Sequence, residues 1–181
     1  MTCIVGLVQD GVVYMGGDSA GVGGYSLSQR GDQKVFVNNG YLFGFTSSFR
    51  MGQLLRYRFV PPPCHTWDLE RHMTTDFVDS VRECFKEHVY GQWVNSEQQG
   101  GTFLVGTQGR LFVVQSDFQV GWNAAPYNAV GCGDDLALGA LYATESLGWE
   151  PVKRVETALR AAEAYSAGVR GPFTVISLPA A

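Results

Sequence analysis

The sequence predicts an α+β fold in which two antiparallel sheets pack together and helix pairs cover their outer faces, giving a four-layer αββα sandwich. Turn dipeptides such as Asp10-Gly11 separate short apolar runs in both halves of the chain, which indicates hairpins. Segments with apolar residues at helical spacing follow each group of strands. No linker or low-complexity tract interrupts the 181 residues, so a single domain spanning residues 1–181 is expected.

Each half of the chain begins with strands. In the first half, Cys3–Val8 and Val12–Met15 flank the Asp-Gly turn, and Lys34–Val37 and Tyr41–Thr46 flank a second turn signal, Asn-Asn-Gly. In the second half, the strand-like segments are Thr102–Thr107, Arg110–Gln115 and shorter pieces up to Val130. Both groups therefore predict antiparallel sheets built from hairpins.

Four helices and a last strand complete the predicted fold. Ser47 or Ser48 can cap a helix that ends before the three prolines at 61–63. A second helix is expected to start at Thr74 or Thr75 and to bury one stripe of apolar side chains. The remaining elements are helices over 134–147 and 151–167, each followed by a glycine, and a strand over 172–178.

Composition argues against several classes of partner. The formal net charge is −4, and no run of lysine or arginine offers the positive surface that nucleic acids bind. No apolar run reaches the roughly 18 residues of a membrane span, and the first residues lack the features of a signal peptide. A cytoplasmic protein that binds no membrane is therefore expected. Cys64, His65 and His72 lack the spacing of a zinc site, so the sequence predicts no metal and no other cofactor.

Thr2 gives the clearest indication of a catalytic residue in this sequence. Removal of Met1, which a small second residue permits, would leave a threonine that carries both a hydroxyl and a free α-amine. A threonine hydroxyl needs a base to become a nucleophile, and an N-terminal amine can serve as that base. The ordinary pKa of such an amine, about 7.7–8.0, lies close to the working pH. The sequence thus predicts attack on an amide bond by Thr2.

The first hairpin brings a carboxylate close to Thr2. With a two-residue Asp-Gly turn, residues whose numbers sum to 21 face each other, so Asp18 lies beside Thr2. A one-residue bulge would shift this register, which leaves Cys3 as a rival nucleophile. Lys34 stands at the start of another strand in the same predicted sheet. Spacing alone favours a solvated lysine at this position over a catalytic one.

Five parts of the sequence together resemble the proteasome β subunits and the bacterial HslV peptidase, which are threonine peptidases among the N-terminal-nucleophile hydrolases. They are the threonine at position 2 and the segments GGDSAG, QKVF, VGCGDDLALGALYA and EAYSAG. The resemblance spans nearly the whole chain, and it keeps the family's order and spacing. It implies that Thr2 is the nucleophile, that Lys34 lowers the proton affinity of the Thr2 hydroxyl and amine, and that Asp18 holds Lys34 charged.

The resemblance also assigns supporting roles to other residues. Glu163 and Ser166 match an acid and a serine that help to position the amine, although the family's acid is usually an aspartate. Cys132 takes the place of a family serine, and a thiol forms weaker hydrogen bonds than a hydroxyl. Ser48 aligns with the glycine whose backbone N–H stabilises the oxyanion. Ser19 lies in the matched GGDSAG segment and is counted among the substrate-binding residues.

By the same resemblance, the primary specificity pocket contains side chains of both charges. Its expected lining residues are Gly21, Asp32, Phe36, Thr46 and Arg50. Asp32 would favour a basic substrate side chain and Arg50 an acidic one, so the sequence leaves the preferred side chain open.

Three functions remain open at this point. The first is a threonine endopeptidase that cleaves peptides or unfolded proteins inside a homo-oligomeric ring or stacked rings; the resemblance implies the ring and allows an ATP-dependent unfoldase as a partner. The second is an N-terminal-nucleophile amidase that acts on a small non-peptide amide. The third is a non-catalytic structural subunit, as proteasome α subunits are.

Overall fold

The computed structural model describes residues 1–64, 67–94 and 97–180. Within these residues the strands are β1 (Cys3–Gln9), β2 (Val12–Gly17), β3 (Ala20–Gly23), β4 (Ser26–Gln29), β5 (Val35–Asn38), β6 (Tyr41–Phe45), β7 (Gln92–Val94), β8 (Glu97–Gln99), β9 (Phe103–Thr107), β10 (Arg110–Val114), β11 (Val120–Gly121), β12 (Tyr127–Gly131) and β13 (Thr174–Pro179). The α-helices are α1 (Phe49–Tyr57), α2 (Leu69–His72), α3 (Val78–Glu87), α4 (Asp134–Ala143) and α5 (Pro151–Tyr165). A π-helical segment, η1 (Met73–Phe77), joins α2 to α3, and a 3₁₀ turn, η2 (Glu145–Leu147), follows α4.

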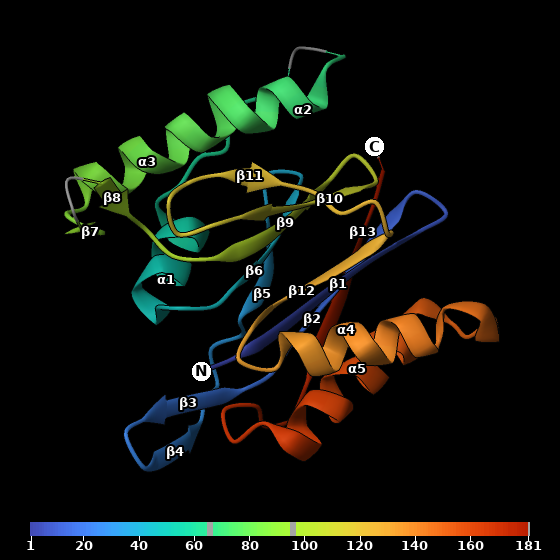
Figure 1. Cartoon of the computed structure of the whole chain (residues 1–181). Coiled ribbons are helices and arrows are strands. Elements are labelled where there is room, and N and C mark those ends of the chain that lie inside the picture. Colours follow the sequence, from blue (N-terminus) through green and yellow to red (C-terminus); the bar gives the residue numbers. More distant parts are fainter. Residues whose placement is uncertain (65–66, 95–96, 181) are drawn as a thin grey trace.

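Two antiparallel sheets form the centre of the molecule. One has the strand order β12-β1-β2-β13, and the other has the order β11-β10-β9-β6-β5. Figure 1 shows the two sheets stacked, with α4 and α5 beside the first sheet and α1 and α3 beside the second. The α+β class and the antiparallel hairpins that the sequence predicts are confirmed.

Apolar side chains fill each space between these layers. Ile4, Met15 and Leu42 belong to the cluster between the two sheets. The strand β1 alternates, because Ile4 faces the other sheet while Cys3, Val5 and Leu7 pack with α4 and α5. A third cluster, rich in phenylalanine, lies between the five-stranded sheet and the helices α1 and α3. The candidate active site described below is therefore held by strands that are buried on both faces.

Tight turns fix the strand registers. Asp10-Gly11, Asn39-Gly40 and Gln108-Gly109 each have positive φ at both central residues, as a two-residue type I′ hairpin turn requires. In the first hairpin Ile4 pairs with Gly17 and Gln9 with Val12. The predicted register, in which paired numbers sum to 21, is therefore confirmed.

The second predicted helix begins earlier than expected. It starts at Leu69, because the Asp68 side chain accepts a hydrogen bond from Arg71 N and caps the first turn. The threonines expected to start it lie inside the helical run instead, where Thr74 Oγ1 and Thr75 Oγ1 donate to carbonyls four residues earlier. The prediction of a start at Thr74 or Thr75 is wrong.

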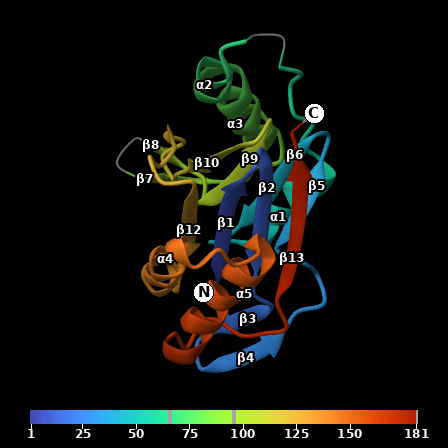
Figure 2. The same ribbon diagram turned by 90° about the vertical axis from the view of Figure 1, so that its right-hand side faces the viewer.

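The structure contains a small hairpin after Ser19, which the glycine-rich sequence of this stretch did not predict. β3 and β4 pair from Ala20 with Gln29 to Gly23 with Ser26. Figure 2 shows this hairpin at the end of the molecule where the N terminus lies.

Among the described residues, no helix combines the length and apolar character that a membrane crossing requires.

Candidate active site

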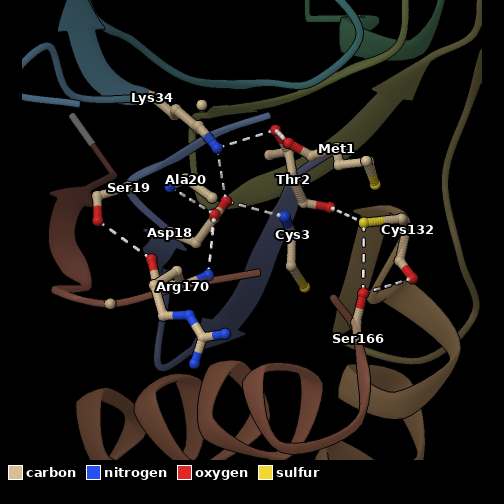
Figure 3. Close-up of polar contacts among 12 residues, drawn as sticks. Met1, Thr2, Cys3, Asp18, Ser19, Ala20, Lys34, Cys132, Ser166 and Arg170 are labelled. Atoms are coloured by element: carbon tan, nitrogen blue, oxygen red, sulfur yellow. Dashed lines mark hydrogen bonds and ion pairs between the residues drawn. The ribbon is translucent and has the colours of Figure 1, made fainter. Parts of the chain in front are cut away.

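A buried lysine is the centre of the candidate site. The Lys34 side chain is 1% exposed, and its Nζ donates to Thr2 Oγ1 at 2.9 Å and to Asp18 Oδ1 at 2.8 Å. Figure 3 shows the three side chains meeting in this way. Thr2 precedes β1, Asp18 follows β2, and Lys34 precedes β5, so neighbouring strand ends of both sheets bring the three residues together.

Backbone groups from three segments hold the Asp18 carboxylate in place. Asp18 Oδ1 accepts from Cys3 N at 3.0 Å, and Oδ2 accepts from Ala20 N at 2.9 Å and from Arg170 N at 3.3 Å. These three N–H groups fix the position and orientation of the carboxylate. Asp18 can therefore act as a fixed negative partner for Lys34.

The environment of Lys34 acts on its charge in two directions. Burial lowers the pKa of Lys34, and the neighbouring Asp18 carboxylate opposes this effect. An isolated buried ammonium would be costly, and the ion pair at 2.8 Å offsets part of that cost. A positive charge 2.9 Å from Thr2 Oγ1 favours loss of the hydroxyl proton, because it stabilises the resulting oxyanion.

Cys3, the rival nucleophile, points to the other face of β1. Its side chain belongs to the fully buried cluster under α4 and α5. Burial is the main cause that raises the pKa of the Cys3 thiol, and the Asp18 charge adds to it. A thiol held protonated in an apolar core is a poor nucleophile. The geometry thus favours Thr2 over Cys3.

Gly131 permits the close approach of β12 to Thr2. Its φ is +111°, and a Cβ at this position would overlap the Thr2 carbonyl oxygen and carbon. The next residue, Cys132, donates its backbone N–H to Thr2 O at 2.8 Å. The glycine therefore lets the backbone of Thr2 be held from one side.

We expect Gly131→Ala to destabilise the protein by about 2–4 kcal/mol, from an unfavourable φ and from overlap with Thr2. The position of Thr2 should change as well, because its carbonyl group must shift to make room for the Cβ. Gly139→Ala is the matched control, since a Cβ there meets no atom within 4 Å and a helical alanine is favourable. Thermal unfolding of both variants checks this; equal stability of the two would contradict it.

Cys132 and Ser166 lie on the opposite side of Thr2 from Lys34 (Figure 3). Cys132 Sγ is 3.5 Å from Thr2 O and 3.4 Å from Ser166 Oγ, and Ser166 Oγ donates to Cys132 O at 3.3 Å. Glu163 makes a different contact: its Oε1 accepts a hydrogen bond from Gly171 N at 2.9 Å. Cys132 thus contacts Thr2 directly and Ser166 contacts Cys132, while the described contact of Glu163 holds the loop after α5.

A pocket opens beside Thr2. Its lining residues are Met1, Thr2, Val22, Phe45, Thr46, Ser47, Ser48 and Phe49. Thr46 and Ser48 were expected at the substrate-binding site from the sequence. Val22, Phe45 and Phe49 were not, because their apolar character indicates core or strand positions equally well. The sequence offered one signal for Phe49 as a pocket residue: its apolar side chain comes directly after Ser48, the helix cap.

The Ser48 backbone N–H is engaged within the loop. It donates to Thr46 O at 2.6 Å, while the Ser48 side chain caps α1 by accepting from Arg50 N and Met51 N. In this structure, then, the N–H expected to stabilise an oxyanion has a partner in the chain. Use of that group on a substrate would require the Thr46–Ser48 turn to open.

Four other expected substrate-binding residues lie outside this lining. Phe36 is buried in the aromatic core, stacked on Phe43 with ring centroids 5.4 Å apart, because the strand turns it toward α1. Asp32 forms a two-bond ion pair with Arg30, at 2.7 and 2.8 Å. Arg50 is exposed on the first turn of α1, and Gly21 lies in β3.

Ser19 is a structural neighbour of the site. Its hydroxyl and its backbone N–H both donate to Arg170 O, at 3.1 and 2.9 Å. These bonds tie the segment after Asp18 to the loop before β13. His65, one of the residues considered above for a zinc site, lies outside the described residues. Among the residues that the structure describes, no group of three or more histidine, cysteine, aspartate or glutamate side chains could hold a metal ion.

Comparisons with known proteins identify the fold. No family model matches the chain, and no curated protein matches it. BPH of Thiobacillus denitrificans in complex with epoxomicin is 17% identical with a TM-score of 0.83, covering 99% of this chain and 100% of that chain. A second structure of BPH is 18% identical with a TM-score of 0.81, covering 99% of each. HslV of Trypanosoma brucei is 18% identical with a TM-score of 0.70, covering 98% of this chain and 99% of that chain. At these identities the likeness establishes the fold, and the chain has the proteasome-like fold of BPH and HslV.

Proposed function

We propose that this protein is a threonine peptidase of the N-terminal-nucleophile hydrolase class, which attacks amide bonds with Thr2 after Met1 has been removed. The observation that carries the proposal is the buried Lys34 ammonium, 2.9 Å from Thr2 Oγ1 and 2.8 Å from Asp18 Oδ1. A buried ion pair is a poor source of stability, so its position against a hydroxyl favours a chemical role. The likeness in fold to BPH, which is seen in complex with epoxomicin, supports it.

The proposed reaction uses the hydroxyl and the amine of one residue. With Met1 attached, Thr2 Oγ1 donates to Met1 O, and Thr2 has no free amine. Once Met1 is gone, the Thr2 amine takes the proton of Oγ1 as the oxygen attacks the substrate carbonyl carbon. The same amine then gives that proton to the leaving amine. An ester to Thr2 remains, and water hydrolyses it to regenerate the hydroxyl.

In this scheme Lys34 and Asp18 are electrostatic groups, and the residues on the far side position Thr2. Lys34 stabilises negative charge on Oγ1, and Asp18 keeps Lys34 charged. Cys132 holds the Thr2 carbonyl through its backbone N–H, and Ser166 holds Cys132. Glu163 is proposed to act less directly, through the Gly171 loop.

The wild-type protein tests this proposal in two measurements. Intact-mass spectrometry should show loss of Met1, and fluorogenic peptides should be hydrolysed faster than acylated small amines. Turnover of only the small amides would favour the amidase, which shares the nucleophile. Full retention of Met1 together with no turnover of either class would favour the non-catalytic subunit.

We further propose that copies of the chain assemble into a homo-oligomeric ring or stacked rings whose chamber encloses the Thr2 sites. Exposed apolar side chains such as Tyr25, Tyr142 and Tyr165 offer surface for such contacts. Negative-stain imaging and mass photometry should show closed particles, and a monomer at micromolar concentration would contradict the proposal. An ATP-dependent unfoldase remains a proposed partner, required if the assembly degrades unfolded but not folded proteins.

We expect Cys3→Ala to keep activity within about threefold of the wild type, because a buried protonated thiol takes no part in the reaction. Its cost should be a modest loss of stability from a small cavity. Turnover of one peptide substrate, measured with circular dichroism melting, checks this. Loss of activity in a Cys3→Ala protein that melts like the wild type would shift the nucleophile by one residue.

A further inference from the structure

The pocket beside Thr2 combines apolar walls with hydroxyl groups. Val22, Phe45 and Phe49 provide the apolar surface, and Thr46, Ser47 and Ser48 provide hydroxyls. The lining residues of the pocket include no lysine, arginine, aspartate or glutamate. A charged substrate group that enters such a pocket loses hydration and gains no ion pair.

Two charged side chains near Phe49 neutralise each other. Arg30 and Asp32 form parallel hydrogen bonds of 2.7 and 2.8 Å, and the Arg30 guanidinium lies 4.3 Å from the centre of the Phe49 ring. The pair is partly exposed, with side chains 39% and 42% accessible. This pair, at the rim of the pocket beside Phe49, therefore adds no net charge there, although the sequence places an acid at this position.

Phe49 is held rigidly enough to act as a wall. Its ring meets Phe45 edge to face at a centroid distance of 5.8 Å, and Lys34 Nζ lies 5.7 Å from its centre. Phe45 is fixed in turn, because a Cβ on Gly52 of α1 would overlap its ring. Phe45 therefore cannot turn aside easily, and it blocks movement of the Phe49 ring on the side where the two rings meet.

We propose that this pocket selects an uncharged apolar side chain on the residue whose carbonyl Thr2 attacks, that Phe49 sets the size limit, and that the Arg30–Asp32 pair keeps the rim neutral. This inference rests on the proposed peptidase function. It names the substrate class that the sequence left open between a basic and an acidic side chain.

The first test compares peptides that differ only in that side chain. For the wild-type assembly, kcat/KM for alanine, valine or leucine should exceed that for arginine and that for glutamate by at least about tenfold each. A preference for either charged peptide would overturn the inference. Phenylalanine should be a poorer substrate than leucine, because Phe49 limits the space.

Removing the wall should invert the size preference. Phe49→Ala should raise the phenylalanine-to-alanine ratio of kcat/KM by about tenfold or more. Tyr57→Ala is the matched control, because Tyr57 is an exposed aromatic residue at the other end of α1. An unchanged ratio in a folded Phe49→Ala protein would remove Phe49 from specificity.

Removal of one partner of the Arg30–Asp32 pair should change the arginine-to-glutamate ratio of kcat/KM, and the direction of the change should depend on which partner is removed. Arg30→Ala leaves Asp32 alone and should raise the arginine-to-leucine ratio about two- to fivefold. Asp32→Asn leaves Arg30 alone and should raise the glutamate-to-leucine ratio by a similar factor. Both gains should shrink at high salt. A change of the arginine-to-glutamate ratio in the same direction in both variants, or no change in either, would contradict a role for the pair.

A binding measurement separates this inference from the proposed reaction. Short acetylated peptides that end in leucine, arginine or glutamate mimic the acyl product, and their affinities can be measured by NMR or calorimetry without turnover. Leucine-ended peptides should bind tightest, and Phe49→Ala should change their order. If binding follows this order while no amide is hydrolysed, the pocket is correct and the peptidase is not. Equal affinities for all three peptides would refute the pocket.

Discussion

Thr2→Ala is expected to lower kcat/KM for peptide substrates by at least about 10³-fold, because it removes the only proposed nucleophile. The fold should persist, since the Thr2 backbone contact to Cys132 N does not involve the side chain. Thr2→Ser is the matched variant. It keeps a hydroxyl near Lys34, and a large part of the activity should survive.

Three measurements on these variants decide the matter. Processing at Met1, particle size and turnover should be recorded on the same preparations, so that a failure of maturation is not read as a failure of chemistry. Wild-type turnover in a correctly processed Thr2→Ala protein would defeat the assignment of Thr2. Similar losses in the alanine and serine variants, with normal assembly, would also count against a hydroxyl nucleophile.

Lys34→Met is expected to lower kcat about 10²- to 10³-fold, the usual effect of deleting one group that stabilises an oxyanion. The variant keeps the length of the side chain and loses its charge. Stability should fall by about 3 kcal/mol, because the buried Asp18 charge loses its partner but keeps three backbone donors. Lys86→Met is the control, since Lys86 is exposed and its nearest carboxylate is 3.6 Å away.

A second substitution separates chemistry from stability at this position. Asp18→Asn in the Lys34→Met background removes the unpaired buried charge, so part of the lost stability should return while activity stays low. Urea unfolding and turnover of the single and double variants check this. Recovery of turnover in the double variant would show that Lys34 acts on folding alone.

Local signals in the sequence were enough for the hairpins and their registers. The Asp10-Gly11 turn fixed the pairing of β1 with β2, and with it the position of Asp18 beside Cys3 N. The expectation that Lys34 begins a strand in the same sheet as the first hairpin is wrong, because β5 belongs to the other sheet. The position of Lys34 beside Thr2 therefore depends on a contact between strands of different sheets, which spacing cannot supply. Resemblance to a known family supplied it, and the structure brings the three side chains together.

Other parts of the site depend on long-range packing. Val35 and Phe36 are both buried although they point to opposite faces of β5, and alternation does not say which of the two faces meets substrate. Glu163 occupies the matched place on α5, but the loop at Gly171 captures its carboxylate. The neutral rim arises because Arg30 reaches Asp32, a pairing of side-chain geometry that sequence spacing alone does not determine.

The bonds between Arg170 and the Asp18–Ser19 segment have a consequence for folding. Asp18 Oδ2 accepts from Arg170 N, and Arg170 O accepts from Ser19 N, so residues that are 152 positions apart in the sequence complete one cluster. Until Arg170 has folded against Asp18 and Ser19, the Asp18 carboxylate lacks one of its three backbone donors. The ion pair between Lys34 and Asp18 therefore gains its full set of contacts only when these distant parts of the chain have folded together.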